Sequence, residues 1–142
     1  MTFVGKNTAH FFNKADKSEA GWKVIENCGR TLSSVKMFPV AVPFDTAEAA
    51  SYLDYRVLIA GGGEYTLTAY FAPSNNLSKN SGLRYGVSFD RASPVIADSV
   101  PVEFVAGDYN NNLWSMGVLD NAHILTTAHK LRKGLISFTS MD

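Results

Sequence analysis

The chain has 142 residues, and its 13 Lys and Arg residues balance its 13 Asp and Glu residues, so the formal net charge is zero. Hydrophobic residues make up 46% of the sequence and charged residues 18%, which excludes a disordered chain and is typical of a globular domain. The balanced charge and the absence of a Lys/Arg block disfavour a nucleic-acid partner and a membrane-surface role. Cys28 is the only cysteine, which excludes an internal disulfide.

The start of the sequence, MTFVGKN, has no basic region followed by an apolar region, so we expect no signal peptide. No apolar run approaches the length of a transmembrane helix. The sequence also has no repeat and no linker-like segment, and it predicts a single domain over residues 1–142.

The first third of the chain predicts short strands. An edge strand is expected within residues 9–21, and further strands are expected within residues 22–30 and 33–39, the second of which ends at a proline. The spacing of Asp45 and Glu48 is that of a capping box and predicts one short helical turn.

Residues 52–72 have the alternation of two strands on either side of Gly61-Gly62-Gly63. Glycines supply the positive φ of a tight turn at low steric cost, so this segment is predicted to be a β-hairpin. The glycine run is not a phosphate loop, because it lacks the GxGxxG spacing and precedes a strand.

Residues 81–94, SGLRYGVSFDRASP, contain the clearest alternation in the sequence. Leu83, Tyr85, Val87 and Phe89 are predicted to face the core, and the other face starts with Arg84 and reaches Asp90. The polar face is either a binding site or a solvated surface, and a structural tie at the rim of a sheet is favoured for its two charged residues.

The last third predicts short strands at residues 95–100 and 101–107, a strand or turn at Trp114, a strand near residues 123–131 and a final strand at residues 135–142. Many short strands at close spacing, with turn residues between them, predict an antiparallel all-β sandwich or barrel.

The sequence predicts no catalytic, metal or cofactor site. His10, His123 and His129 are not in a metal-binding arrangement, and no pair of acidic residues is singled out for glycoside hydrolysis. Aromatic residues make up 12% of the chain, and Trp22 and Trp114 lie beside polar turn residues. An exposed indole can stack on a sugar ring, but core packing is the favoured interpretation for each tryptophan.

The order of the motifs resembles that of a known family. GWKVIENCGRTLSSVKMFP is followed by YLDYRV, by a segment ending in YFAP, by LRYGVSFD and by NLWSMGVLDN. This succession resembles the C-terminal domain of glycoside hydrolase family 115, the xylan α-glucuronidases, and covers nearly the whole chain.

The resemblance implies a jelly-roll β-sandwich like those of carbohydrate-binding modules. It also implies a secreted or periplasmic parent enzyme whose catalytic barrel lies N-terminal to this segment, so that this chain alone is not an enzyme. The implied function is that of a non-catalytic accessory module of a xylan-debranching α-glucuronidase, which packs on the catalytic domain or a dimer partner and binds acidic xylan. The alternatives are a stand-alone carbohydrate-binding or structural interaction domain and, last, a small enzyme.

A sugar site on this module would use aromatic residues for stacking, arginines for the glucuronate carboxylate and an aspartate for hydroxyl groups. The residues that we expect to contribute are Trp22, Arg30, Arg84, Tyr85, Asp90 and Trp114.

Overall fold

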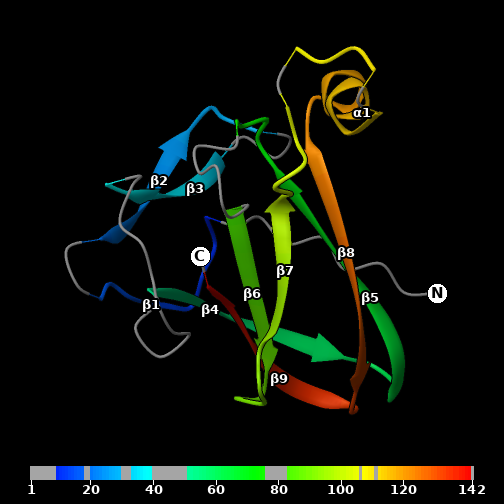
Figure 1. The fold of residues 1–142 in the computed structure, drawn as a ribbon. Coiled ribbons are helices and arrows are strands. Elements are labelled where there is room, and N and C mark those ends of the chain that lie inside the picture. Colours follow the sequence, from blue (N-terminus) through cyan, green and yellow to red (C-terminus); the bar gives the residue numbers. More distant parts are fainter. Residues whose placement is uncertain are drawn as a thin grey trace. The chain divides into compact units, whose positions relative to one another are not determined.

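A computed structural model describes residues 9–17, 20–29, 33–39, 51–75, 83–105, 107–110 and 112–141. That part of the chain forms nine strands and one helix (Figure 1). The strands are β1 (Asn13–Ala15), β2 (Gly21–Glu26), β3 (Ser33–Phe38), β4 (Tyr52–Ile59), β5 (Gly63–Phe71), β6 (Leu83–Phe89), β7 (Val95–Val100), β8 (His123–Leu131) and β9 (Gly134–Met141). The helix is α1 (Asn112–Asp120).

Five strands form one sheet in the order β1-β4-β9-β6-β7. β1 runs antiparallel to β4 with Lys14 opposite Leu53, and β6 runs antiparallel to β9 with Ser88 opposite Thr139. β1 is an edge strand, as the sequence predicts. The prediction of an antiparallel all-β fold of the sandwich class is confirmed, whereas the jelly-roll topology stays a prediction.

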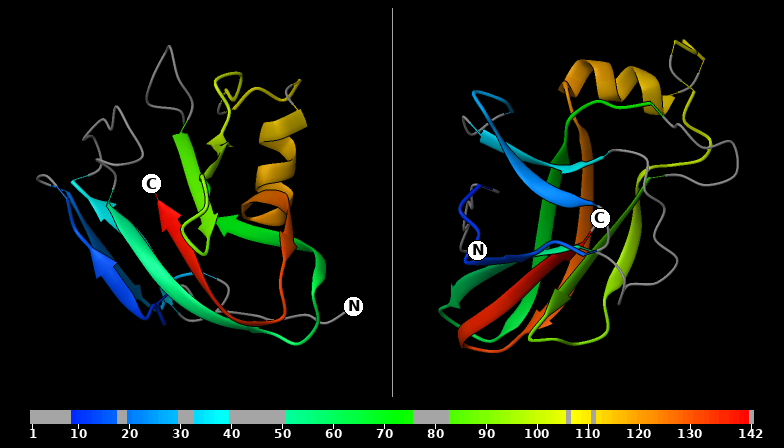
Figure 2. Two further views of the ribbon diagram at one scale, coloured as in Figure 1. Left: turned by 90° about the horizontal axis from the view of Figure 1, so that it is seen from below. Right: turned by 90° about the vertical axis from the view of Figure 1, so that its left-hand side faces the viewer.

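Two further pairs of strands form separate two-stranded sheets. β2 pairs with β3 from Gly21 opposite Phe38 to Glu26 opposite Ser33, and Figure 2 shows the pair as a twisted ribbon. β5 pairs with β8 along its whole length, from Gly63 opposite Leu131 to Phe71 opposite His123. Antiparallel ladders of this length satisfy the backbone donors and acceptors of both strands on the paired side.

The predicted hairpin over residues 52–72 is wrong, although both of its strands exist. β4 pairs with β1 and β9, whereas β5 pairs with β8 in another sheet. None of Gly61, Gly62 and Gly63 has the positive φ that a two-residue hairpin turn needs. The glycine run therefore leads the chain from one sheet into another.

The contacts divide the chain into two compact units, and each unit is discontinuous in sequence. Unit 1 comprises the described residues of Met1–Leu58, Gly86–Val95 and Leu135–Asp142, and unit 2 comprises those of Ile59–Tyr85 and Ile96–Gly134. The boundaries fall within β4, β6, β7 and β9, so these strands contribute residues to both units. The prediction of a single domain stays a prediction.

The core of unit 1 forms around β2, β3 and β4. Its buried residues are Ala20, Trp22, Met37, Leu53 and Tyr55, and Phe11, Val35 and Phe138 pack against them. The ring of Tyr55 stacks on that of Phe138 at 5.3 Å between centroids. Burial of these large side chains supplies the main hydrophobic stabilisation of the unit.

Unit 2 contains the β5–β8 ladder and α1, which packs against β8. The prediction of a strand or turn at Trp114 is wrong, because Trp114 lies in the first turns of α1. Apolar side chains of α1 occur on both its inward and its outward side, so the sequence has no amphipathic stripe. Asn121 ends the helix with a φ of 49°, and its N–H donates to the Val118 carbonyl oxygen at 3.3 Å.

The remaining sequence predictions have mixed outcomes. The strands at residues 95–100 and 123–131 are confirmed, whereas residues 101–105 form turns and not a strand. The predicted helical turn at Asp45 to Glu48 lies outside the described residues. Within the described part of the chain, no helix has the length and apolar character needed to cross a membrane.

Candidate functional site

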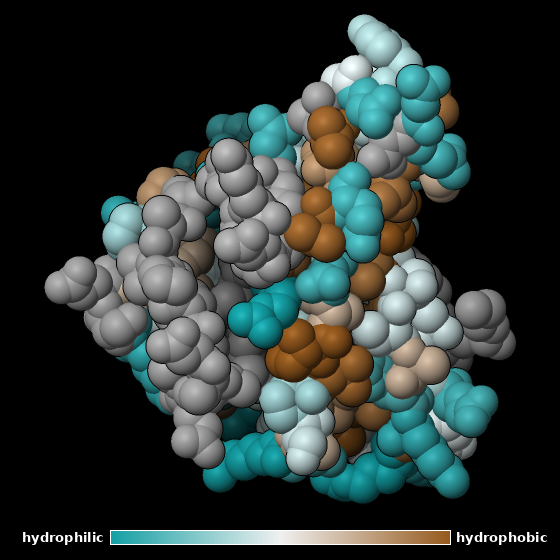
Figure 3. Space-filling view, in the orientation of Figure 1, coloured by the Kyte–Doolittle hydropathy of each residue, from teal (hydrophilic) through white to brown (hydrophobic). Residues whose placement is uncertain are grey.

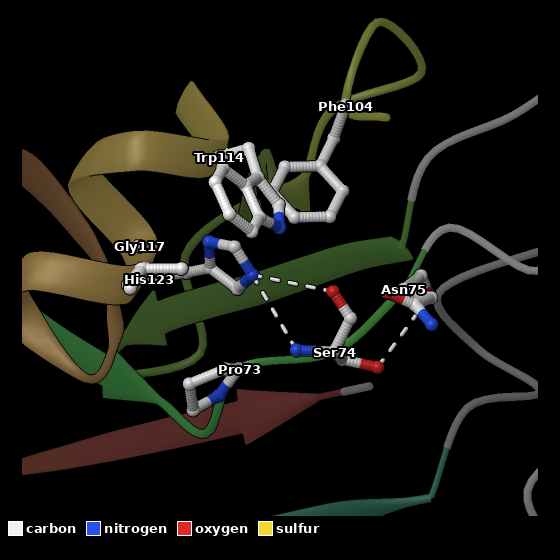
Figure 4. Close-up of a pocket in the computed structure, with 8 residues that line it drawn as sticks. Pro73, Ser74, Asn75, Phe104, Trp114, Gly117 and His123 are labelled. Atoms are coloured by element: carbon white, nitrogen blue, oxygen red, sulfur yellow. Dashed lines mark hydrogen bonds between the residues drawn. The ribbon is translucent and has the colours of Figure 1, made fainter. Parts of the chain in front are cut away.

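A pocket of about 270 Å³ opens in unit 2 beside α1. Three segments line it: the residues that follow β5, the segment before α1, and α1 with the start of β8. The lining residues are Pro73, Ser74, Asn75, Phe104, Trp114, Gly117, Val118 and His123. In Figure 4, Trp114 and Phe104 lie on one side of His123, and Ser74 and Asn75 lie on the other.

Helical spacing directs three α1 residues into this pocket. Trp114, Gly117 and Val118 are separated by three and four positions and therefore share one side of the helix. Gly117 is buried, and a Cβ at this position would lie 3.2 Å from Cε1 of His123. The missing side chain thus allows the helix to approach the imidazole closely.

The imidazole of His123 is held by contacts on two sides. The ring of Phe104 meets it edge to face, with 4.9 Å between centroids and 89° between planes. His123 Nε2 lies 3.4 Å from the Ser74 backbone nitrogen and 3.3 Å from the Ser74 carbonyl oxygen. One tautomer accepts from the N–H and the other donates to the carbonyl, so Nε2 has a backbone partner in either case.

The indole of Trp114 is half-buried, and its orientation is supported from outside the pocket. The ring of Tyr109 meets it edge to face, with 5.1 Å between centroids and 79° between planes. The segment that carries Tyr109 is shaped by Asp108, whose carboxylate accepts a bond from the Asn110 N–H at 2.9 Å. One edge of the indole thus rests on an aromatic residue while part of its surface reaches the pocket.

The pocket combines aromatic and aliphatic walls with neutral polar groups. Its described lining contains no Asp, Glu, Lys or Arg. It therefore has no carboxylate pair for hydrolysis of a glycosidic bond. The groups that it offers are aromatic faces, a hydroxyl, an amide and an imidazole, which suit binding.

The comparisons with known proteins now decide the family. A model of the Glycosyl hydrolase family 115 C-terminal domain matches residues 2–138, nearly the whole chain. The chain belongs to this family. No curated protein matches it. The resemblance of the motifs is confirmed, and the family 115 C-terminal domain is not the catalytic domain of the hydrolase.

Of the residues predicted for a sugar site, two aromatic residues of this family 115 domain are buried. Trp22 in β2 is 8% exposed and belongs to the core of unit 1, and its Nε1 has no hydrogen-bond partner among the described residues. Tyr85 in β6 is also 8% exposed and meets Phe71 edge to face at 5.0 Å. Neither presents a ring face to solvent for stacking on a sugar.

The charged residues at the two ends of β6 lie far apart along the strand. Arg84 is exposed near the start of the strand, and Asp90 follows its last residue. Six residues of extended chain span about 20 Å, which is longer than one sugar ring. Arg30 lies outside the described residues.

Asp90 has a clear structural role. Its carboxylate accepts a bond from the Ser137 N–H at 3.0 Å, and its own N–H donates to the Ser137 carbonyl oxygen at 2.8 Å. Asp90 and Arg91 both have positive φ, and the Ser88 hydroxyl donates to the Ala92 carbonyl oxygen at 2.8 Å. These bonds tie the turn after β6 to β9.

Trp114 is the predicted residue that lines the pocket, and its neighbours were not foreseen. Ser74, Asn75, Phe104 and His123 come from three separate segments, and no local motif links them. The sequence predicts no helix around Gly117, so its close approach to His123 is seen only in the structure.

Among the residues that the structure describes, two side chains have shifted pKa values. A hydrogen bond from Lys14, aided by one from the Trp22 N–H, lowers the pKa of Asp16, and burial lowers the pKa of His129. Neither side chain lines the pocket. No group of three or more potential metal ligands occurs among the described residues.

Proposed function

We propose that this chain is a non-catalytic accessory module that docks on the catalytic domain of its own glycoside hydrolase. The observation that supports the proposal is the outer face of α1, which we define as Leu113, Met116 and Leu119. Their side chains are 43%, 51% and 83% exposed. An outward helix side normally carries polar residues, and exposed apolar side chains that gather on one surface mark an interaction site.

Apolar side chains continue into the segments near the helix. Val102, Val105 and Tyr109 are 44%, 54% and 83% exposed. Ile96 in β7 is 49% exposed, and Figure 3 shows a band of apolar residues where Figure 1 places β7. A docking partner could therefore cover much more than the helix alone.

The chemistry of this surface and the family indicate the kind of partner. α1 has one charged residue, Asp120, so its outer face suits an apolar protein surface and not a polyanion. The family is defined as the C-terminal domain of a glycosyl hydrolase, so the other domains of that hydrolase are the natural neighbours. The absence of acidic residues from the described pocket lining supports a non-catalytic role.

The test is binding of the purified chain to a separately produced catalytic region of the same hydrolase, followed by calorimetry. We expect a stoichiometric complex that the triple variant Leu113→Gln, Met116→Gln, Leu119→Gln abolishes. The double variant Tyr70→Gln, Ile124→Gln is the matched control, because these exposed apolar residues pair on the β5–β8 ladder. Sedimentation that shows dimers of the chain alone, lost in the triple variant, would assign the surface to a second copy instead.

A second candidate function is binding of acidic xylan, which the pocket at Trp114 and the exposed Arg84 support. The test is calorimetric titration with glucuronic-acid-decorated xylo-oligosaccharides, with undecorated ones as the comparison. Tighter binding of the decorated sugar, lost in Arg84→Ala, is the expected result for recognition of the acid. Equal heats with both sugars would contradict a role for the carboxylate.

A further inference from the structure

We propose that the pocket between α1 and the Ser74 segment binds one uncharged sugar ring of a polysaccharide. This inference deepens the second candidate function, because it names the site and the part of the sugar that the site takes. It differs from recognition of glucuronate, which needs a cation. It is also independent of docking through the outer face of α1, whose residues do not line the pocket.

The aromatic part of the site is Trp114. Its half-buried indole lines the pocket, and the edge-to-face contact with Tyr109 restricts its orientation. A preoriented aromatic ring loses little side-chain entropy on binding and offers an apolar face to the C–H groups of a sugar. The partly exposed Val118 extends this apolar wall along the helix.

The polar part of the site faces the helix from the Ser74 segment. The Ser74 hydroxyl and the exposed Asn75 side chain supply donors and acceptors, and His123 Nε2 already lies near the Ser74 backbone. Figure 4 shows Ser74 and Asn75 on the other side of His123 from Trp114. A ring placed between the two sides would contact apolar groups on its face and polar groups at its hydroxyl-bearing edge.

Charge and size select the ligand class. The described lining includes no Lys or Arg, so a glucuronate carboxylate would enter without a permanent counter-charge. The volume of about 270 Å³ is just below the range of about 300–1,000 Å³ that holds drug-sized ligands. A single uncharged pyranose, with the adjoining sugar rings in solvent, fits both the absence of a counter-charge in the described lining and the volume of the pocket.

The two tryptophans of the chain allow a direct test. The ¹⁵N-labelled chain has two indole N–H signals, one from buried Trp22 in unit 1 and one from Trp114 in the pocket. We expect titration with undecorated xylotetraose at millimolar concentration to shift the Trp114 signal and to leave the Trp22 signal unchanged. Trp114→Phe assigns the two signals, because it removes one of them.

Three variants connect the shift to the pocket. Trp114→Ala and the rim substitution Asn75→Ala are each expected to weaken binding about ten-fold, which corresponds to the loss of one good contact. Asn75 is exposed, so its variant should stay folded even if Trp114→Ala does not. Tyr70→Ala removes an exposed aromatic residue outside the pocket. It should change the affinity less than two-fold, which corresponds to a difference in binding free energy of less than about 0.4 kcal/mol.

The inference is overturned by either of two results. One is a folded chain whose Trp114 signal does not respond to xylotetraose. The other is binding that Trp114→Ala and Asn75→Ala leave intact. A response only to acid-decorated sugar that disappears in Arg84→Ala would also overturn it, while supporting recognition of the acid. Loss of complex formation with the catalytic region concerns docking alone and leaves this inference standing.

Discussion

At the scale of single residues, several polar side chains act as ties between segments. Asp16 is an example in unit 1, where one carboxylate oxygen accepts from Lys14 Nζ at 2.7 Å and the other accepts from the Trp22 N–H at 2.9 Å. A Cβ on Gly21 would lie 2.9 Å from Cγ of Asp16, so the glycine makes room for the carboxylate. This acid helps to hold the chain before β2 to the strand.

The lowered pKa of Asp16 predicts a pH dependence of stability. The folded chain holds the carboxylate ionised below its ordinary pKa of 3.8, so the stabilisation is present above that value and is lost as the pH falls through the folded pKa. Both partners are exposed, so the effect should stay within about 1 kcal/mol. Urea unfolding should show a shallower acid slope in Asp16→Asn than in wild type.

The amide oxygen of Asp16→Asn keeps an acceptor for the Trp22 N–H, whereas the charge and the acceptor for Lys14 Nζ are lost. Asp98→Asn, an exposed acid in β7, is the matched control and should keep the wild-type slope. Identical acid slopes for wild type and Asp16→Asn would contradict the assignment.

Ser51 is a second residue-scale tie and is fully buried. Its hydroxyl accepts from the Lys17 N–H at 2.8 Å and donates to the Ala20 carbonyl oxygen at 3.0 Å. Ser51→Ala leaves these backbone groups without their partner and should cost about 1–3 kcal/mol of unfolding free energy. The measurement is urea unfolding, with exposed Ser137→Ala as a control that should stay close to wild type. A cost equal to that of the control would show that water replaces the hydroxyl.

At the scale of elements, alternation predicts strands well and their partners poorly. β6 and β8 have the predicted bounds to within one residue, because a period of two marks a strand regardless of what it pairs with. The same pattern places β4 and β5 on either side of the glycine run, yet they pair in different sheets. Pairing depends on residues far away in sequence, which local pattern does not contain.

The burial of strand faces and the position of the helix also depend on residues far away in sequence. Arg84 is exposed as alternation predicts, but Gly86 and Ser88 on the same side of β6 are buried, because small residues fit where another segment packs. α1 was missed because its apolar residues point to both sides. The candidate site is assembled from such unpredicted parts, so Trp114 could be named from the sequence while its partners could not.

The β5–β8 ladder supports a prediction at this scale through His129 of β8. Its ring lies 2.7 Å from the Thr127 hydroxyl, and burial lowers its pKa from 6.5. In a window below pH 6.5 the unfolded chain binds a proton that the folded chain does not, so stability falls as the pH falls through this window. His129→Gln should flatten the dependence.

The measurement is urea unfolding of wild type and variant at about pH 7.5 and about pH 5.5. His10→Gln, at an exposed position in unit 1, is the matched control and should keep the wild-type dependence. A wild-type pH dependence that persists in His129→Gln would assign the titration to another group.

At the scale of the whole molecule, the chain crosses between the two units several times. It does so within β4 at Leu58–Ile59, within β6 at Tyr85–Gly86, within β7 at Val95–Ile96 and within β9 at Gly134–Leu135. A strand that contributes residues to both units cannot lose its ladder in one unit without disturbing the residues that continue into the other. This continuity argues for cooperative unfolding, as expected of a single domain.

The prediction is that both units unfold in one transition, and each unit has one tryptophan to report on it. Trp22 reports on unit 1 and Trp114 on unit 2. With 5-fluorotryptophan incorporated, the two ¹⁹F signals should lose their folded intensity at the same urea concentration, because the shared strands couple the units. Trp114→Phe assigns the signals. Two separate midpoints would instead mean that the units fold independently, and the single-domain prediction would then be wrong.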